Sequence, residues 1–178
     1  MESPAPALLI GSVVPDFEAD CSIAGHIKFH EFIGDSWVIL FSHPADYTPV
    51  CTTELSTVSS MADKEFADRG VKCIALSCDS VESHVGWHAD VEAYSTNVRG
   101  CTQAMSFPII ADPTRAIAKS FNMLPVSGEL DDPSSGLPMT VRSVFIIGPD
   151  KKVKLMMTYP ASCGRNFNEI LRIVDSLQ

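Results

Sequence analysis

The chain has 178 residues and a formal charge of −9 at neutral pH, with 46% apolar and 20% charged residues. This length suits one domain with a sizeable core, so we expect a single domain over residues 1–178. The negative charge argues against nucleic acid or an anionic membrane as the main partner. Since no apolar run approaches the ~18 residues of a membrane span, no transmembrane segment is expected.

The N-terminal stretch and the cysteines bear on the compartment. Residues 1–10 contain no basic segment and only a short apolar run, so they do not predict a signal peptide, and we expect a cytoplasmic protein. The first seven residues are rich in Pro and Ala and are expected to be mobile. The six cysteines form no Cys-x-x-Cys pair, so neither a zinc site nor a thioredoxin-type dithiol is indicated. We expect mostly buried free thiols.

The predicted elements, taken in order, begin with an N-terminal hairpin over residues 17–21 and 27–32. A nearly continuous apolar run predicts a central buried strand over residues 37–42. The helix that follows, over residues 49–69, is expected to end at Gly70. Further strands are expected at 71–78, 108–111, 141–147 and 152–158, and further helices at 80–94, 113–121 and 166–177. Residues 122–140 are rich in Pro, Gly, Ser and Asp and predict a long loop.

The order of these elements predicts the fold class. Strand–helix alternation implies a parallel core, and the late hairpin adds antiparallel strands. We therefore expect an α/β protein with a central mixed sheet flanked by helices, a pattern compatible with a thioredoxin-like fold. In the helix 80–94, Val81, Val85 and His88 or Ala89 are expected on one face. In the last helix, the residues expected to face inward are Phe167, Ile170, Leu171 and Val174.

The junction between the strand 37–42 and the next helix carries the first chemical signal. Thr48 is a good N-cap residue and Pro49 is favoured at the first helical position, which puts Cys51 in the first turn of the helix. Unpaired backbone N–H groups and the positive end of the helix dipole lie there, so we expect the Cys51 thiol to ionise readily. The dipole contributes about 1 kcal/mol. A nearby cation, by preference an arginine, must supply the rest.

The same stretch carries a family resemblance. Pro44-x-x-x-Thr48-x-x-Cys51 matches the active-site pattern of the peroxiredoxins, and the wider run from Phe41 to Leu55 resembles the one-cysteine branch of that family. Shorter matches, which extend over nearly the whole chain, begin at Gly34, Ala75, Asp79, Phe107, Gly148, Tyr159 and Gly164. The resemblance implies a thioredoxin-like peroxidase fold in which Cys51 is the nucleophile.

The resemblance also implies roles for other residues around the thiol. The hydroxyl of Thr48 would contact the Cys51 sulfur and the peroxide. Arg142, at the start of a predicted strand, would hold the sulfur as an anion and polarise the peroxide oxygen. Pro44 would shape the loop and shield the sulfur.

Two residues near the motif each have two interpretations. His43, which precedes the proline of the motif as in the one-cysteine branch, is either a structural turn residue or a support for the thiol. Glu54, one turn into the helix, is either a solvated charge or an anchor for an arginine. The anchor is the favoured interpretation of Glu54.

A second set of residues suggests a different enzyme class. One-cysteine peroxiredoxins with phospholipase activity carry Gly-x-Ser-x-Gly with His and Asp partners, and the matching positions here are Ser36, His30 and Asp150. Val38 stands where the last glycine of that motif would be. A nucleophile elbow needs small residues because its backbone is strained. An ordinary entry into the strand 37–42 is therefore favoured over a calcium-independent phospholipase site at Ser36.

Metal and cofactor signals are weak. His84 and His88 are four residues apart on a predicted helix, a spacing that can serve a metal, but no third ligand is evident. We therefore expect a solvated helix face, no metal site and no organic cofactor. Cys163 lies in a predicted loop and is a candidate accessory thiol.

Together these observations predict a thiol-dependent peroxidase. The Cys51 thiolate would attack a peroxide oxygen and become a sulfenic acid. Hydrogen peroxide, alkyl hydroperoxides and phospholipid hydroperoxides are the substrates that the resemblance implies. The C-terminal Val-Cys-Pro of two-cysteine members is absent. The expected reductant is then an external thiol, either glutathione or a thioredoxin-like protein, in an enzyme of antioxidant defence and redox homeostasis.

A non-enzyme function and the oligomeric state stay open at this point. A redox-sensing scaffold or holdase, in which Cys51 signals without turning over, is the non-enzyme alternative. The resemblance implies a homodimer in which a C-terminal arm packs on the partner subunit. The sequence ends at Gln178, shortly after the last predicted helix, which leaves the homodimer undecided.

Overall fold

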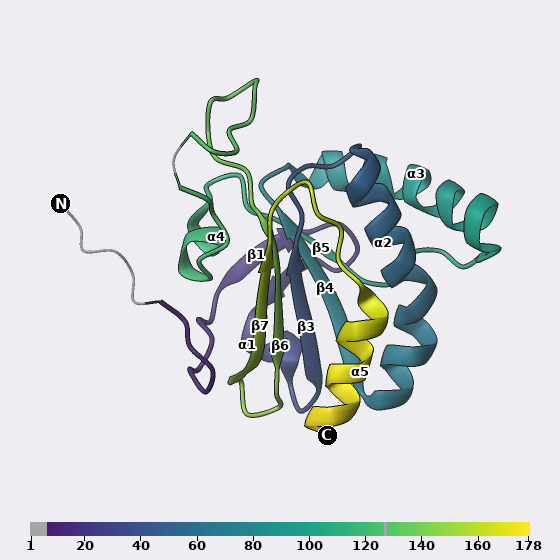
Figure 1. Cartoon of the computed structure of the whole chain (residues 1–178), viewed down its shortest axis with the longest axis vertical. Coiled ribbons are helices and arrows are strands. Elements are labelled where there is room, and N and C mark those ends of the chain that lie inside the picture. Colours follow the sequence, from purple (N-terminus) through teal and green to yellow (C-terminus); the bar gives the residue numbers. More distant parts are fainter. Residues whose placement is uncertain (1–6, 127) are drawn as a thin grey trace.

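A computed structural model describes residues 7–126 and 128–178, so the expected mobile start of the chain lies, except for Ala7, outside the described residues. The described part holds a seven-stranded sheet with helices on both faces (Figure 1). The strands are β1 (Glu18–Cys21), β2 (Gly25–Lys28), β3 (Trp37–Ser42), β4 (Val71–Ser77), β5 (Ile109–Ala111), β6 (Arg142–Ile147) and β7 (Val153–Tyr159). The α-helices are α1 (Phe29–Ile33), α2 (Pro49–Met61), α3 (Val81–Arg99), α4 (Ala116–Ser120) and α5 (Phe167–Leu177). No helix in these ranges is long and apolar enough to cross a membrane.

The sheet is mixed, and β3 lies inside it. The strand order is β2-β1-β5-β4-β3-β6-β7. β3 pairs in parallel with β4, where Ile39 is opposite Cys73, and antiparallel with β6, where Leu40 is opposite Phe145. β4 and β5 are also parallel, and the N-terminal hairpin β1–β2 extends the sheet beyond β5. This is the mixed sheet that the order of the elements predicts.

Alternate side chains of the central strands contribute to two separate cores. Ile39 and Phe41 of β3 belong to one core, and Val38 and Leu40 to the other, as the two-residue period of a strand requires. The first core lies beneath α2, α3 and α5, which stand together on the right of Figure 1. The second core lies beneath α1 and α4. Both faces of β3 are buried, which explains its uninterrupted apolar sequence.

The helical segment after β3 changes its winding along its length. α2 ends at Met61, a π-helical turn spans Ala62–Phe66, and a 3-10 turn spans Ala67–Arg69. Gly70 then ends the segment with φ 65° and ψ 30°, the left-handed conformation that favours glycine. The predicted end of this helix is therefore confirmed.

One predicted strand is partly a helix. The sequence suggests a strand over residues 27–32, but β2 ends at Lys28 and α1 begins at Phe29. Lys28 pairs with Glu18, the first residue of β1, so the chain beyond Lys28 has no strand to pair with. A helical turn satisfies its backbone groups instead. The ring of Phe29 stacks on that of Phe17 at 4.6 Å between centroids, within the second core.

The helix α3 is longer than predicted, and the face that it buries differs from the predicted one. It continues to Arg99 and ends at Gly100, beyond the predicted end at residue 94. Val85, placed on the apolar face by the sequence, is 51% exposed. The buried residues of α3 are His84, Trp87, Val91 and Ser95. A polar residue, His84, faces inward because a buried carboxylate pairs with it, a contact that an apolar pattern cannot show.

The other predicted helices differ less. The helix predicted over residues 113–121 is the shorter α4. In α5, Phe167, Ile170 and Val174 are buried and Leu171 packs at the edge of the core, which confirms the predicted inward face.

Candidate active site

Cys51 lies in the first turn of α2, after the loop that leaves the carboxyl end of β3, and is fully buried. Thr48 occupies the N-cap position in an extended conformation and Pro49 the first helical position, as the sequence predicts. The Thr48 side chain does not cap the helix, because its Oγ1 donates to the Ala45 carbonyl oxygen at 2.9 Å. Unpaired amide N–H groups in this turn make the surroundings of the sulfur favourable to an anion.

Arg142, the first residue of β6, lies against the sulfur. Its Nη1 is 3.3 Å from Cys51 Sγ and donates to Glu54 Oε2 at 2.6 Å. Its Nε donates to the Ala161 carbonyl oxygen at 2.7 Å, which fixes the guanidinium plane. The Arg142 side chain is 3% exposed. A buried guanidinium next to a buried thiol is the cation that the sequence argument requires.

Glu54 joins Arg142 to a second arginine. Its carboxylate accepts hydrogen bonds of 2.9 Å from both Nε and Nη2 of Arg165, a bidentate arrangement, and one of 2.6 Å from the Arg165 backbone N–H. All three side chains are buried. Two guanidiniums and one carboxylate leave one net positive charge beside Cys51. Glu54 is thus an anchor for arginines and not a solvated charge.

The titration of Glu54 reflects this network. Burial by itself would raise the pKa of the carboxyl, but the hydrogen bonds and charge of Arg165, with the charge of Arg142, outweigh it and hold the pKa below its usual range. Glu54 is therefore ionised at neutral pH. Arg165 was not singled out from the sequence, although it belongs to the matched run that begins at Gly164.

His43 follows β3 directly and is fully buried next to Pro44, which is also buried. Its Nε2 lies 2.8 Å from Asp46 Oδ1, and Asp46 Oδ2 lies 2.7 Å from Nδ1 of His84 on α3. Burial alone would raise the pKa of Asp46, but the hydrogen bonds from His43 and His84 outweigh it and hold the pKa well below its usual range. Asp46 was not singled out from the sequence, because its partner on α3 is distant along the chain.

The solvated face predicted for His84 and His88 is wrong. His84 is fully buried, and its Nε2 lies 3.2 Å from the Ile110 carbonyl oxygen. The Nε2 of His88 lies 3.0 Å from Ser22 Oγ. Burial lowers the pKa of His88. The two histidines point to different partners, so they do not form a shared metal site.

One other group could hold a metal. Within residues 7–126 and 128–178, His43, Asp46 and Asp79 bring potential ligand atoms within 4.8 Å of one another. These atoms already have hydrogen-bond partners: the Asp46 carboxylate binds the two histidines, and Asp79 Oδ2 accepts from the Asp46 backbone N–H and from Ser77 Oγ. The donor set is therefore better described as a hydrogen-bonded cluster than as a metal centre.

The three phospholipase candidates make separate contacts. The Nε2 of His30 lies 2.9 Å from the Val14 carbonyl oxygen. Asp150 accepts from Lys154 Nζ at 2.7 Å. The backbone N–H of Ser36 bonds the Ile33 carbonyl oxygen. No hydrogen bond between described residues connects Ser36, His30 and Asp150.

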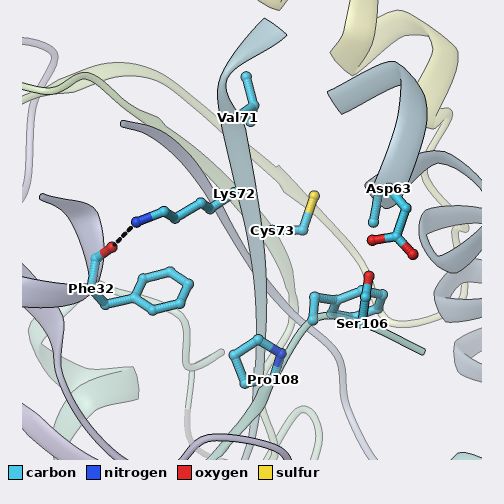
Figure 2. A pocket seen from close by; sticks show the side chains of 9 residues that line it. Phe32, Asp63, Val71, Lys72, Cys73, Ser106 and Pro108 are labelled. Atoms are coloured by element: carbon cyan, nitrogen blue, oxygen red, sulfur yellow. Dashed lines mark hydrogen bonds between the residues drawn. The ribbon is translucent and has the colours of Figure 1, made fainter. Parts of the chain in front are cut away.

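A second cysteine, Cys73, lines a pocket of about 220 Å³ toward the amino end of β4 (Figure 2). Figure 2 shows Lys72 directed toward Phe32, whose carbonyl oxygen accepts from Lys72 Nζ at 2.8 Å, and not toward Cys73. Burial, with a smaller effect of the Asp63 charge, raises the pKa of Cys73 far above its usual range. This pocket therefore offers no activated nucleophile.

The remaining cysteines differ from Cys51 in their surroundings. Burial raises the pKa of Cys78 to about 12. Burial also raises the pKa of Cys21. Cys163, the candidate accessory thiol, is exposed, in the loop whose Ala161 carbonyl holds Arg142. Among the described residues, Cys51 is the cysteine in hydrogen-bond contact with an arginine.

Comparison with known proteins gives the family. Residues 10–156 match the model of the AhpC/TSA family. The chain belongs to the AhpC/TSA family. It is 56% identical to peroxiredoxin-6 of Rattus norvegicus over 171 residues, which cover 96% of this chain and 73% of that protein. It is 53% identical to peroxiredoxin-6 of Gallus gallus, covering 97% of this chain and 74% of the relative.

Solved structures of AhpC/TSA relatives agree with the fold. A mutant of peroxiredoxin 6 from Arenicola marina superposes with a TM-score of 0.88 at 51% identity, over 97% of this chain and 74% of that one. The one-cysteine peroxiredoxin of yeast mitochondria gives a TM-score of 0.84 at 44% identity, over 96% and 76%. The predicted thioredoxin-like fold is confirmed, and this AhpC/TSA protein is a thiol peroxidase, an oxidoreductase.

Proposed function

We propose that Cys51 is the thiol that reacts with peroxide and that it passes through a sulfenic acid. The observation that carries this proposal is the 3.3 Å contact of Arg142 Nη1 with Cys51 Sγ at the first turn of α2. The thiolate is the nucleophilic form of cysteine, and it is stabilised by a buried guanidinium and a helix N-terminus. Arg165 and Glu54 keep that guanidinium in place.

The reaction is a displacement at oxygen. The Cys51 thiolate attacks one oxygen of the hydroperoxide, the S–O bond forms, and the O–O bond breaks with its electron pair on the leaving oxygen. That oxygen takes a proton and departs as water or an alcohol. Arg142 can donate both to the sulfur and to the peroxide oxygens as negative charge moves between them.

The loop residues would define the space above the sulfur. Pro44 shields the sulfur from water, and the Thr48 hydroxyl can turn from the Ala45 carbonyl to donate to the peroxide. His43 supports the site as a hydrogen-bond acceptor, since its Nδ1 is buried and has no partner among the described residues.

An external thiol would return the sulfenic acid to the thiol. The printed description of the yeast mitochondrial relative names a thiol resolving mechanism via glutathione and thioredoxin systems. We propose the same classes of reductant here, with hydrogen peroxide and organic or phospholipid hydroperoxides as substrates. The free thiols in the described part of the chain suit a reducing compartment such as the cytoplasm. The chain would act as a single-domain unit, and its homodimer is a prediction for sedimentation measurements.

The decisive experiment is stopped-flow consumption of hydrogen peroxide by the wild-type protein and by Cys51→Ser. The wild type should consume one equivalent rapidly without added thiol, and a mass spectrum after trapping should show a sulfenic acid on Cys51. Cys51→Ser should do neither. Equal rates in the two proteins would refute the assignment. Fatty-acid release that depends on Ser36 and not on Cys51 would instead favour the phospholipase alternative.

A further inference from the structure

A buried cluster behind His43 has no role in the reaction described so far. The Asp46 carboxylate, 1% exposed, lies between two fully buried imidazoles, 2.8 Å from His43 and 2.7 Å from His84. Ser83 Oγ also donates to Asp46 Oδ2, at 2.8 Å. The Asp46 backbone N–H donates to Asp79 Oδ2 at 3.0 Å. The cluster thus ties the loop after β3 to the first turns of α3.

The partners of His84 determine where its protons are. Its Nε2 faces the Ile110 carbonyl oxygen at 3.2 Å, and a carbonyl oxygen only accepts, so Nε2 must carry a hydrogen. Its Nδ1 faces the Asp46 carboxylate, which is ionised and also only accepts. Both ring nitrogens are then donors, and His84 is an imidazolium.

Charge balance gives the state of His43. The His84 cation and the Asp46 anion neutralise each other, as a fully buried pair requires. A second cation at His43 would have no hydrogen-bonded anion of its own, since Asp46 is already paired with His84 and Asp79 Oδ2 accepts from the Asp46 backbone N–H and from Ser77 Oγ. His43 is therefore neutral, and because its Nε2 donates to Asp46 Oδ1, its single hydrogen is on Nε2. Its Nδ1 is left with a free lone pair.

That lone pair has no partner in the part of the chain that the structure describes, although it is buried. An unpaired buried polar atom is unfavourable, so it calls for a partner. The His43 ring lies 5.1 Å from that of Trp87, whose Nε1 donates to Thr52 Oγ1, next to Cys51. The His43 carbonyl oxygen accepts from Thr140 Oγ1, two residues before Arg142. His43 is thus held among the residues around the sulfur.

We propose that Asp46 and His84 are positioning residues that hold His43 as its Nε2–H tautomer. The Nδ1 of His43 then accepts the O–H of the bound hydroperoxide, and later it accepts the O–H of the Cys51 sulfenic acid. In the displacement, the hydrogen held by Nδ1 stays on the oxygen that bonds to sulfur, while the other oxygen leaves with the electron pair. The inference rests on the proposed function, because it assigns the groups that orient the substrate for Cys51.

Nitrogen NMR of ¹⁵N-histidine-labelled protein tests the tautomer directly, with His43→Gln to assign the signals. The spectrum at neutral pH should show one bare and one protonated nitrogen in His43, with the bare nitrogen at Nδ1, and two protonated nitrogens in His84. A proton on His43 Nδ1 in the wild type, whether alone or with one on Nε2, would overturn the proposal. The tautomer is read from the wild-type protein, and His43→Gln serves only to assign the signals.

The variant His84→Leu tests the consequence. Without the His84 cation, the buried Asp46 carboxylate should draw a proton onto His43 Nδ1 and turn the acceptor into a donor. Sulfenic acid formation should then be slower than in the wild type at neutral pH and recover toward the wild-type rate at higher pH. The titratable groups in contact with His43 are Asp46 on its own loop, Asp79 after β4 and His84 on α3.

The matched control is His88→Leu, the same change one turn further along α3, where the imidazole contacts Ser22 and not Asp46. It should leave the pH profile and the His43 spectrum unchanged. A His84→Leu profile that matches the wild type would refute the positioning role. Failure of the proposed function is seen separately, as peroxide consumption that survives Cys51→Ser, since the His43 tautomer does not depend on that thiol.

Discussion

Cys51 and Cys73 are both buried cysteines near the central parallel strands, one beyond the carboxyl end of β3 and the other toward the amino end of β4. Arg142 donates to the sulfur of Cys51, and the first turn of a helix surrounds it. Cys73 lies near Asp63, and Lys72 is directed away from it (Figure 2). Burial alone therefore keeps a thiol protonated, and a buried cation distinguishes the surroundings of Cys51 from those of Cys73.

The largest expected effect is the difference in oxidation between these two cysteines. With one equivalent of hydrogen peroxide, Cys51 should oxidise at least about 1,000 times faster than Cys73, because the raised pKa of Cys73 leaves almost no thiolate. Differential alkylation followed by peptide mass spectrometry measures both sites in one sample. Similar oxidation of the two sites would break the comparison.

Removal of the Arg142 cation should bring the reactivity of Cys51 closer to that of Cys73. Arg142→Gln should slow peroxide reduction about 100- to 1,000-fold, as expected for a lost donor at a developing charge. Arg69→Gln is the control, since Arg69 pairs with Asp175 at the surface. The measurement is the second-order rate constant in stopped flow, and a loss below threefold would contradict the role of Arg142.

Arg165 should matter less than Arg142. It contacts Glu54 and the Ser143 carbonyl oxygen and makes no hydrogen bond to Cys51. Arg165→Gln leaves Glu54 to draw the whole charge of Arg142, so we expect about a tenfold loss of rate, typical of an outer-shell partner. The rate constants of single and double arginine variants, measured together, show whether the two act as one unit.

The acid stability of the protein should depend on Glu54. Its folded pKa is depressed, so its contribution to stability is present at neutral pH and is lost as the pH falls below the usual value of about 4.3. Glu54→Gln should lower the free energy of unfolding at pH 7 by about 3–5 kcal/mol, since it leaves buried guanidiniums uncompensated. Urea unfolding at pH 7 and pH 4 measures this, and the difference from wild type should shrink at pH 4.

The smallest effect is expected for the modification rate of Cys73. Asp63 is exposed and adds less than burial to the raised pKa of Cys73. Asp63→Asn should therefore speed modification of Cys73 by a thiol reagent less than about tenfold. A larger gain would mean that charge, and not burial, keeps Cys73 inactive.

Local rules were sufficient for much of the fold. The Thr48–Pro49 start and the Gly70 end of the helical segment follow from backbone preferences, and the two-sided burial of β3 follows from its apolar run. The strand predicted after Lys28 failed because strand pairing ends where β1 begins, which no local pattern encodes. The family resemblance correctly brought Arg142 to Cys51 across the sheet.

The parts of the site that escaped prediction are polar pairs between distant segments. Arg165 meets Glu54 across 111 positions, and His84 meets Asp46 across 38. An inward histidine breaks the apolar face of α3, so periodicity placed Val85 where His84 belongs. A buried charge is fixed by its partner, and the partner is known only once the chain has folded.

The Cys51 sulfur is completely buried, so the size of the reactant should matter differently for oxidation by a peroxide and for reduction by a thiol. A hydroperoxide presents two small oxygens, whereas glutathione is a tripeptide and a reducing protein is larger still. We expect such a thiol to reach the oxidised sulfur through local opening of the first turn of α2, which the Thr48 side chain does not cap. Local opening of the chain would then set the rate at which a large thiol reduces Cys51.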